Sequence, residues 1–359
     1  MSIKLEDIAK ETGFSISTVS RVLSNSSYRV SEPIREKVLR AAADMGYEPN
    51  IAARSLRTDR TNTVGILVDD LLSPFTPPIV RGIQDFLHEH GFLSLIVNSD
   101  WDPDQEQSAI KTLLSRPVDG IIFVEYSHQT TSDVLERSNK PRVFVHRLFG
   151  SPIQNSVVPD DYYGAGLATS HLIGLGHTRI AYINGPESWH TCRARLSGYK
   201  DTLANQKLSF DASLVQPGDW EIESGYAAAT NLLRLANRPN AIFAANDAMA
   251  LGAIYAIQDA GLKVPEDVAV VGYDNRNFTN TVRPRITTVN MPVIEMGGVA
   301  AELLLKQIAE GRKEEDEIKV KGQLIIRETC GAPESSRTQQ APDSRTLFRR
   351  VLFHKQPED

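Results

Sequence analysis

Two short helical patterns separated by a glycine occupy the first 23 residues, and they restrict the start of the chain to a compact helical unit. Apolar residues repeat at i, i+3 and i+4 spacing on both sides of the glycine: Leu5, Ile8, Ala9, Val19, Val22 and Leu23. Gly13 can adopt the left-handed conformation that ends a helix, and Ser15 stands where a side chain caps the next one. So short a connection is the spacing of a helix-turn-helix.

A third helix is predicted from Ser31 onward, with Ser31 as its cap and Pro33 tolerated in its first turn. Its apolar stripe contains Ile34, Val38, Ala41 and Met45. Three helices of this size bury one small core and leave the second helix free to project. The alternative is an ordinary small helical bundle whose outer residues are only solvated, since three-helix patterns are common.

The outward face of the second helix favours DNA recognition. It carries Ile16, Ser17, Ser20 and Arg21. Recognition helices present their N-terminal residues to base edges in the major groove. Arg21 can pair with a guanine through two hydrogen bonds, and Ile16 can touch a thymine methyl group.

The segment after Tyr47 strengthens this interpretation. Pro49 and Asn50 restart the chain, and residues 51–57 are long enough for only about two helical turns, which are not stable alone in water. Leu56 lies between Arg54 and Arg57, which fits an apolar wedge inserted into the minor groove. The alternative is a linker whose leucine packs on the core.

From Thr63 onward, short apolar runs alternate with helical patterns. Strands are predicted at Thr63–Val68, Leu93–Asn98, Gly120–Val124, Arg142–His146, Arg179–Ile183, Ala241–Ala244 and Val268–Tyr273. Helices are predicted at Pro78–His90, Gln105–Ser115, Ala165–Leu175, Ser224–Leu235 and Met249–Ala260. Continuous apolar strands with helices between them indicate an α/β fold of doubly wound parallel sheets. The length suggests two lobes rather than one large sheet.

Polar and aromatic residues that follow the strands, or that lie at helix starts or in loops between them, are the candidates for a small-molecule site, because doubly wound sheets bind ligands at the carboxyl ends of their strands. Facing lobes would place that site in the cleft between them. The candidates are Phe75, Arg147, Asp160, Arg195, Trp220, Asn246 and Asp274. Carboxylates, amides and arginines can bind vicinal hydroxyls, and an indole offers a flat face to a sugar ring. Phe75 can equally be a core residue, Arg193 is expected to be a surface charge, and Asp247 is expected to cap its helix.

Charge and composition agree with a local DNA-binding unit. The 359-residue chain has a net charge of −6, but residues 1–60 hold ten Lys and Arg against eight Asp and Glu. Neither a signal segment nor a long apolar run appears, and the two cysteines, Cys192 and Cys330, have no metal-binding spacing. We therefore expect a cytoplasmic protein without cofactor, metal or membrane contact. Because neither a phosphate-binding glycine loop nor a catalytic constellation is found, we do not expect an enzyme.

Several independent motifs in one order resemble the lactose-repressor (LacI/GalR) family of bacterial transcriptional regulators, over residues 3 to about 330. They are Thr18–Leu23 (TVSRVL), Gly46–Asn50 (GYEPN), Ala53–Leu56 (ARSL), Gly174–His177 (GLGH), Phe243–Gly252 (FAANDAMALG) and Val264–Asp274 (VPEDVAVVGYD). Two positions differ from the family pattern. Lys4 replaces a small hydroxyl residue often found capping the first helix, and His146 replaces an aspartate in the cleft. His146 introduces a group that titrates near neutral pH, although a core-facing histidine is the expectation.

The resemblance implies roles for particular residues. Leu56 would be the intercalating hinge leucine, and Arg195, Trp220, Asn246 and Asp274 match ligand-binding positions. The full set of candidate DNA-binding residues is Ile16, Ser17, Thr18, Ser20, Arg21, Asn25, Tyr47, Asn50, Ala53, Arg54, Leu56 and Arg57. It further implies lobes joined by several crossovers, with the chain returning to the first lobe near Asn290.

The expected organisation follows from these assignments. Residues 1–48 would form the headpiece, 49–61 the hinge helix and linker, and 62–331 the effector-binding and dimerisation domain. Its first lobe would comprise about 62–159 and 290–320, and its second about 160–289 and 321–331. Residues 332–359 are rich in Pro, Ser, Gln and Arg and are expected to form a flexible tail. Because that tail lacks leucine heptads, we expect dimers rather than tetramers.

The expected function is allosteric control of transcription, most simply repression. A homodimer would bind a pseudo-palindromic operator, and a sugar or sugar derivative between the lobes would change operator affinity. One alternative is a regulator that responds to a purine or nucleoside. The others are a solute-binding type of protein and a DNA-binding protein that no longer responds to any ligand.

Overall fold

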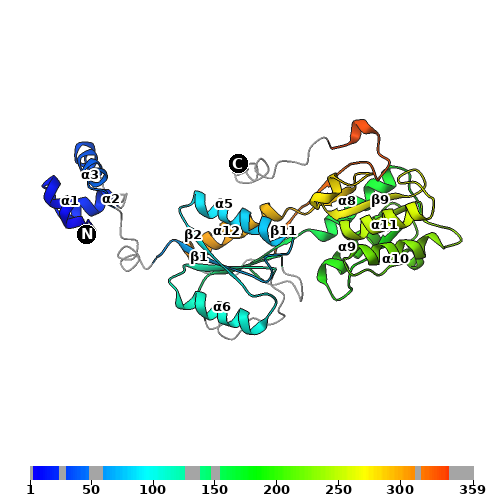
Figure 1. The fold of residues 1–359 in the computed structure, drawn as a ribbon, viewed down its shortest axis with the longest axis horizontal. Coiled ribbons are helices and arrows are strands. Elements are labelled where there is room, and N and C mark those ends of the chain that lie inside the picture. The colour runs from blue at the N-terminus through cyan, green and yellow to red at the C-terminus, as the bar shows by residue number, and fades with distance from the viewer. Residues whose placement is uncertain are drawn as a thin grey trace. The chain divides into compact units, whose positions relative to one another are not determined.

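The computed structural model describes residues 3–23, 30–47, 60–125, 138–146, 154–311 and 317–338. The chain divides into two compact units, Met1–Thr61 and Asn62–Asp359 (Figure 1). Each unit has its own core. No helix in the described ranges is long and apolar enough to cross a membrane.

The first unit is the predicted helical headpiece. Its helices are α1 (Leu5–Thr12), α2 (Ile16–Leu23) and α3 (Glu32–Asp44). They bury one small core made of Ile8, Ala9, Val19, Val22, Val38 and Ala42. Gly13 ends α1 with a φ of 77°, as its sequence position predicted.

The helix caps explain how the turn forms. Ser15 caps α2, because its Oγ accepts a hydrogen bond from the Thr18 backbone at 3.2 Å. Lys4 has no acceptor to offer at the start of α1. The Asp7 carboxylate accepts from the Lys4 backbone nitrogen at 2.8 Å, which is the reciprocal contact of a capping box.

The second unit contains two six-stranded sheets that form its two lobes. The first sheet has the order β11-β5-β4-β3-β1-β2 and all its strands are parallel. Its strands are β1 (Thr63–Val68), β2 (Leu93–Asn98), β3 (Gly120–Val124), β4 (Arg142–Val145), β5 (Ser156–Pro159) and β11 (Ile318–Val320). Helices α5 (Thr76–Glu89) and α12 (Val293–Glu310) cover one face, and α6 (Pro103–Ser115) covers the other (Figure 1).

The second sheet has the order β12-β10-β9-β8-β6-β7, with only β12 antiparallel to its neighbour. Its strands are β6 (Ile180–Ile183), β7 (Val215–Gln216), β8 (Ala241–Ala244), β9 (Ala269–Asp274), β10 (Thr287–Asn290) and β12 (Gln323–Ile325). Four helices accompany it: α8 (Asp161–Gly174), α9 (His190–Asn205), α10 (Ile222–Leu233) and α11 (Asp247–Asp259). Short 3-10 turns lie at Ala212–Leu214, Asn277–Asn280 and Glu334–Ser336.

The chain crosses between the lobes three times. It leaves the first sheet after β5, returns after β10 to form α12 and β11, and crosses again to end in β12. The return therefore comes just after Asn290, as the family resemblance implied. Several connections hold the lobes together while leaving a cleft between their strand ends.

The sequence prediction did not identify α9, α12 or the short strands β5, β7, β10, β11 and β12. The first residues of the expected flexible tail contact the second lobe. Ala332 is buried, the Thr338 backbone nitrogen donates to the Ile326 carbonyl oxygen at 2.9 Å, and Thr338 Oγ1 accepts from the Ile326 backbone nitrogen at 3.0 Å. Residues 339–359 lie outside the described ranges.

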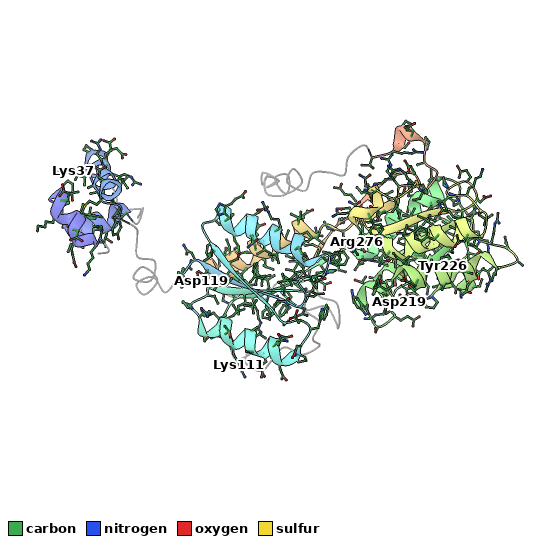
Figure 2. All side chains as sticks on the ribbon, viewed as in Figure 1. Lys37, Lys111, Asp119, Asp219, Tyr226 and Arg276 are labelled. Carbon is green, nitrogen blue, oxygen red and sulfur yellow. The ribbon has the colours of Figure 1, made fainter. Side chains whose placement is uncertain are left out.

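Polar side chains occupy the outer faces of these helices. Lys111 points away from the sheet on the outer side of α6, while Arg276 lies on the side of the second lobe that faces the first (Figure 2).

Candidate functional site

The outer face of α2 presents three of its predicted DNA-contacting side chains to solvent. Ile16, Ser17 and Arg21 are exposed, and Ile16 is 49% accessible although it is apolar. Thr18 and Ser20 are half-buried at the flank of the helix. An exposed isoleucine and an exposed arginine on one helix can contact a thymine methyl group and a guanine edge.

The remaining predicted DNA-binding residues are placed only in part. Tyr47 is half-buried and packs against the headpiece core. Six of the candidates lie outside the described residues: Asn25, Asn50, Ala53, Arg54, Leu56 and Arg57. The predicted hinge helix and the effector candidate Arg147 also lie outside them.

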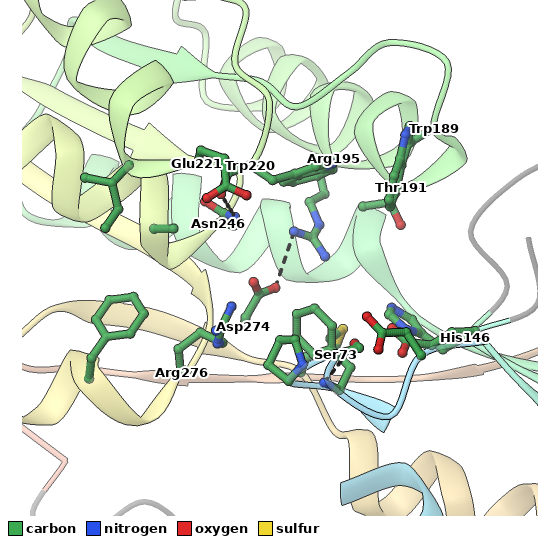
Figure 3. Close-up of a pocket in the computed structure, with 18 of the residues that line it drawn as sticks. Ser73, His146, Trp189, Thr191, Arg195, Trp220, Glu221, Asn246, Asp274 and Arg276 are labelled. Atoms are coloured by element: carbon green, nitrogen blue, oxygen red, sulfur yellow. Dashed lines mark hydrogen bonds and ion pairs between the residues drawn. The ribbon is translucent and has the colours of Figure 1, made fainter. Parts of the chain in front are cut away.

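A pocket of about 580 Å³ lies between the two lobes of the second unit (Figure 3). Five of the seven predicted effector residues line it: Phe75, Arg195, Trp220, Asn246 and Asp274. Its walls come from the segments that follow β1, β3, β4, β8 and β9, together with the starts of α9 and α10. The pocket therefore occupies the carboxyl ends of parallel strands, where the topology predicts a ligand.

Arg195 joins three elements beneath this pocket. Its Nε donates to Asp161 Oδ1 at 2.8 Å, and its Nη1 donates to the Ala245 carbonyl oxygen and lies 3.6 Å from Asp274 Oδ1. Burial alone would lower the pKa of Arg195, but the neighbouring carboxylates of Asp161 and Asp274 raise it. The Arg195 side chain therefore stays positively charged, and its contacts hold Asp161 and Asp274 in place at the base of the pocket.

Asn246, which lines the pocket, also caps α11, a role that the sequence suggested for Asp247. Asp247 does not cap α11. The Asn246 Oδ1 accepts from the Met249 backbone at 2.8 Å, and its Nδ2 donates to the Trp220 carbonyl at 2.8 Å. Asp247 is fully buried and accepts from Thr288 Oγ1 at 2.6 Å and from the Arg276 backbone at 2.7 Å. The aspartate one residue further on thus holds the strand ends together from inside.

Asp274 carries a perturbed carboxyl group at the end of β9. Burial raises its pKa from 3.8 to about 6, and the positive charges of Arg195 and Arg276 oppose part of that rise. Burial and the charge of Asp274 raise the pKa of Asp247 as well. A strongly perturbed carboxyl group in a cleft marks a candidate binding site.

Asp160 was predicted as an effector residue, but it does not line this pocket. Its Oδ1 accepts from the Tyr163 backbone at 3.1 Å, which caps α8. The next residue, Asp161, points the other way and accepts from Arg195 and from Thr191 Oγ1. Since the chain turns from β5 into α8 here, the first aspartate is used by the helix start.

Sequence reasoning missed several pocket residues, namely Asp70, Trp101, Glu125, Trp189, Glu221, Arg276 and Phe278. Position after a predicted strand would have found Glu125, which follows β3 directly. His146 was expected to face the core; it is 7% exposed but lies on the pocket wall. Its Nδ1 lies 3.3 Å from Glu125 Oε1, and its ring meets the edge of Phe75 at a centroid distance of 5.4 Å.

Comparison with known proteins decides the family. Residues 4–50 match the model of bacterial regulatory proteins of the lacI family, and residues 169–330 match that of the periplasmic binding protein-like domain. The ribose operon repressor of Escherichia coli (strain K12) is 34% identical over 310 residues, which cover 85% of this chain and 93% of that protein. The chain belongs to the lacI family of bacterial regulatory proteins.

Other members of the family agree along most of the chain. The HTH-type transcriptional repressor PurR of Aliivibrio fischeri (strain MJ11) is 31% identical over 90% of this chain and 97% of that protein. The solved structure of the lac repressor dimer bound to operator and the anti-inducer ONPF has a TM-score of 0.73 at 30% identity and covers 92% of this chain and 100% of that one. The transcriptional regulator CelR–cellobiose complex has a TM-score of 0.65 at 33% identity, covering 91% and 99%.

Membership confirms the predicted fold and the predicted class of protein. As a lacI-family member, the chain is a DNA-binding repressor with a periplasmic-binding-protein-like effector domain, and it is not an enzyme.

Proposed function

We propose that this repressor changes its affinity for operator DNA when a sugar or sugar derivative binds between the two lobes. The observation that carries the proposal is the composition of the 580 Å³ pocket, where aromatic faces stand beside carboxylate, amide and guanidinium groups. Aromatic faces pack against the apolar faces of sugar rings, and paired polar groups bind vicinal hydroxyls. Phe75, Arg195, Trp220, Asn246 and Asp274 are the proposed effector-binding residues.

A purine or nucleoside is the second candidate. The guanidinium carbon of Arg276 lies 5.8 Å from the Phe75 ring centroid and 5.9 Å from that of Phe278, so a planar base can stack among these groups. The similarity to proteins named PurR favours the same class of ligand. A carboxylate-rich pocket can also bind the amino groups of a base.

For the DNA-binding half, we propose that α2 enters the major groove. Arg21 and Ile16 would contact base edges there. Leu56, between Arg54 and Arg57 in the sequence, would insert into the minor groove as part of a hinge helix that folds on DNA. Asn25, Tyr47, Asn50 and Ala53 would add contacts around these anchors.

We propose that two copies assemble on a pseudo-palindromic operator. A lac repressor of the same family is described as a dimer on its operator. In the present chain β2 is the edge strand of the first sheet, and its apolar Leu93 and Ile96 are 64% and 40% exposed. An exposed apolar edge strand requires a cover, and a second copy supplies one with twofold symmetry.

Effector and operator would be coupled through the angle between the lobes. A ligand bound to both lobes favours the lobe arrangement in which both sets of contacts form. That arrangement sets the separation of the two hinge segments in the dimer. By linkage, operator DNA must then change effector affinity by the same factor.

The test begins with operator fragments selected from random DNA by the full-length protein. Fluorescence anisotropy then measures operator affinity with and without sugars, sugar phosphates, nucleobases and nucleosides. We expect a sugar to change the affinity in the wild type but not in Asp274→Ala. An effect produced only by purines would support the second candidate. DNA binding that no ligand alters would contradict effector control, and a sugar that binds a protein without operator affinity would indicate a solute-binding role.

A further inference from the structure

We infer that the effector is an uncharged molecule with two sugar rings, a disaccharide or a glycoside, and that the Glu125–His146 pair selects it against anionic relatives. The inference rests on the proposed function and narrows its ligand class. It draws on three independent features of the pocket: its aromatic surface, its balance of charge, and the geometry of the pair.

The aromatic surface is larger than one sugar ring requires. All three tryptophans of the chain, Trp101, Trp189 and Trp220, line this one pocket. The rings of Trp189 and Trp220 meet edge to face at a centroid distance of 5.6 Å (Figure 3). Trp101 comes from the opposite lobe and is 41% exposed. A volume of 580 Å³ is within the range of about 300–1,000 Å³ that encloses drug-sized ligands.

The charges of the lining disfavour an anion. Among the pocket residues that the structure describes, Asp70, Glu125, Glu221 and Asp274 supply four carboxylates against the two guanidinium groups of Arg195 and Arg276. Arg195 is already engaged by Asp161 at 2.8 Å and by the Tyr273 ring at 3.6 Å. A phosphate or carboxylate on the ligand would therefore face more negative than positive charge from these residues, and like charges repel.

Glu125 and His146 are neighbouring side chains on the pocket wall that the first lobe contributes. They directly follow the neighbouring strands β3 and β4, and both have left-handed backbones, with φ of 58° and 54°. Their side chains are only 3% and 8% exposed. A strained backbone at two adjacent strand ends that line a cleft is characteristic of functional positions.

The contacts of the pair keep the Glu125 side chain ionised, so that it offers a carboxylate to the pocket. Glu125 Oε2 accepts from Thr76 Oγ1, and Oε1 lies 3.3 Å from His146 Nδ1. Burial alone would raise the pKa of Glu125, but His146, Thr76 and Ser73 hold it below its ordinary value. The carboxylate partner of His146 thus comes from the end of the neighbouring strand β3. Hydroxyl groups can donate to such a carboxylate, whereas anions are repelled by it.

Full-length protein is titrated by calorimetry with matched ligands. The neutral set is cellobiose, maltose, lactose, sucrose and trehalose; the comparison set is glucose, ribose, glucose 6-phosphate, gluconate, cellobionate and hypoxanthine. We expect at least one neutral disaccharide to bind about tenfold or more tightly than every member of the comparison set. Preference for an anion, a monosaccharide or hypoxanthine, or binding of no member, would overturn the inference.

Variants then assign selectivity to the pair. Because a hydrogen bond to a charged group is worth about 10- to 100-fold in affinity, Glu125→Gln should lose that factor for the neutral disaccharide and discriminate less against cellobionate. The exposed Glu89 of α5 gives the matched control, Glu89→Gln, which should behave as wild type. His146→Gln serves as a second variant if Glu125→Gln does not fold. Unchanged selectivity in a folded variant of the pair would overturn its role.

Operator binding measured in the same samples separates this inference from the proposed function. A neutral disaccharide that binds without altering operator affinity would support the ligand class and contradict effector control. An anionic sugar or a nucleobase that alters operator affinity would support effector control and contradict the proposed ligand class.

Discussion

The guanidinium of Arg195 stacks on the ring of Tyr273, with 3.6 Å between the guanidinium carbon and the ring centroid. Both side chains are almost fully buried, and the same guanidinium contacts Asp161 and Asp274. Helix α9, the start of α8 and the end of β9 therefore share one buried cation. Because a buried charge is tolerated only while its partners remain, this cluster responds as a unit to substitution.

Arg195→Leu should lower the free energy of unfolding by about 3–5 kcal/mol, since it leaves the buried Asp161 and Asp274 carboxylates without their cation. Chemical denaturation measures the loss. Arg193 lies on the same helix, is exposed, and donates to the Glu187 and Ser188 carbonyls. Arg193→Leu should therefore cost less than about 1 kcal/mol. Equal costs for the two variants would contradict the buried-cation interpretation.

Stability should depend on pH through Asp274. Burial raises its folded-state pKa from 3.8 to about 6, so the folded protein binds this proton more tightly than the unfolded chain. The stabilisation is complete below about pH 4 and is lost as pH rises towards and past 6, by about 1–3 kcal/mol. Asp274→Asn cannot lose a proton. The difference in unfolding free energy between variant and wild type should therefore shift in favour of the variant from pH 4.5 to pH 7.5; a constant difference would count against the raised pKa.

Periodicity predicted the architecture because each long element repeats its apolar residues over several turns or along a whole strand. The elements it missed have weaker local signals. Helix α12 is covered by α5 and the sheet, and its run of small and apolar residues lacks one polar face. Strands β5 and β12 have four and three residues, too few to establish a period of two.

The sequence could predict which residues lie at the cleft, because the strand order determines that. It could not predict in which direction each side chain points. Asn246 and Asp274 follow strands, and the strand ends converge, so their presence in the cleft follows from the fold. Asp160 also follows a strand, but the direction of its side chain is set by the helix that starts there. The partnership of Glu125 with His146 joins residues 21 positions apart through strand pairing, which one-dimensional patterns do not reveal.

The packing of α5 on α12 predicts a steric effect at Gly82. A Cβ at this position would collide with the carbonyl oxygen of Ile294, because the two helices approach closely here. Gly82→Ala should thus destabilise the first lobe by about 1–3 kcal/mol. At Gly174, the last residue of α8, an added Cβ meets nothing within 4 Å, so Gly174→Ala should be neutral or stabilising. Thermal unfolding of both variants makes the comparison, and a neutral Gly82→Ala would refute the close approach.

The hinge assignment predicts separable effects on the two ligands of the protein. Leu56 would act only by wedging into DNA, so Leu56→Ala should reduce operator affinity by about tenfold or more. Effector affinity measured without DNA should not change, because the proposed effector residues belong to the second unit. Arg21→Ala should also weaken operator binding, but it should additionally relax base preference at one position of each half-site. Anisotropy with the selected operator and with single-base variants distinguishes the two losses. Leu56→Ala with wild-type operator affinity would contradict the minor-groove wedge and leave α2 as the only DNA-reading element proposed.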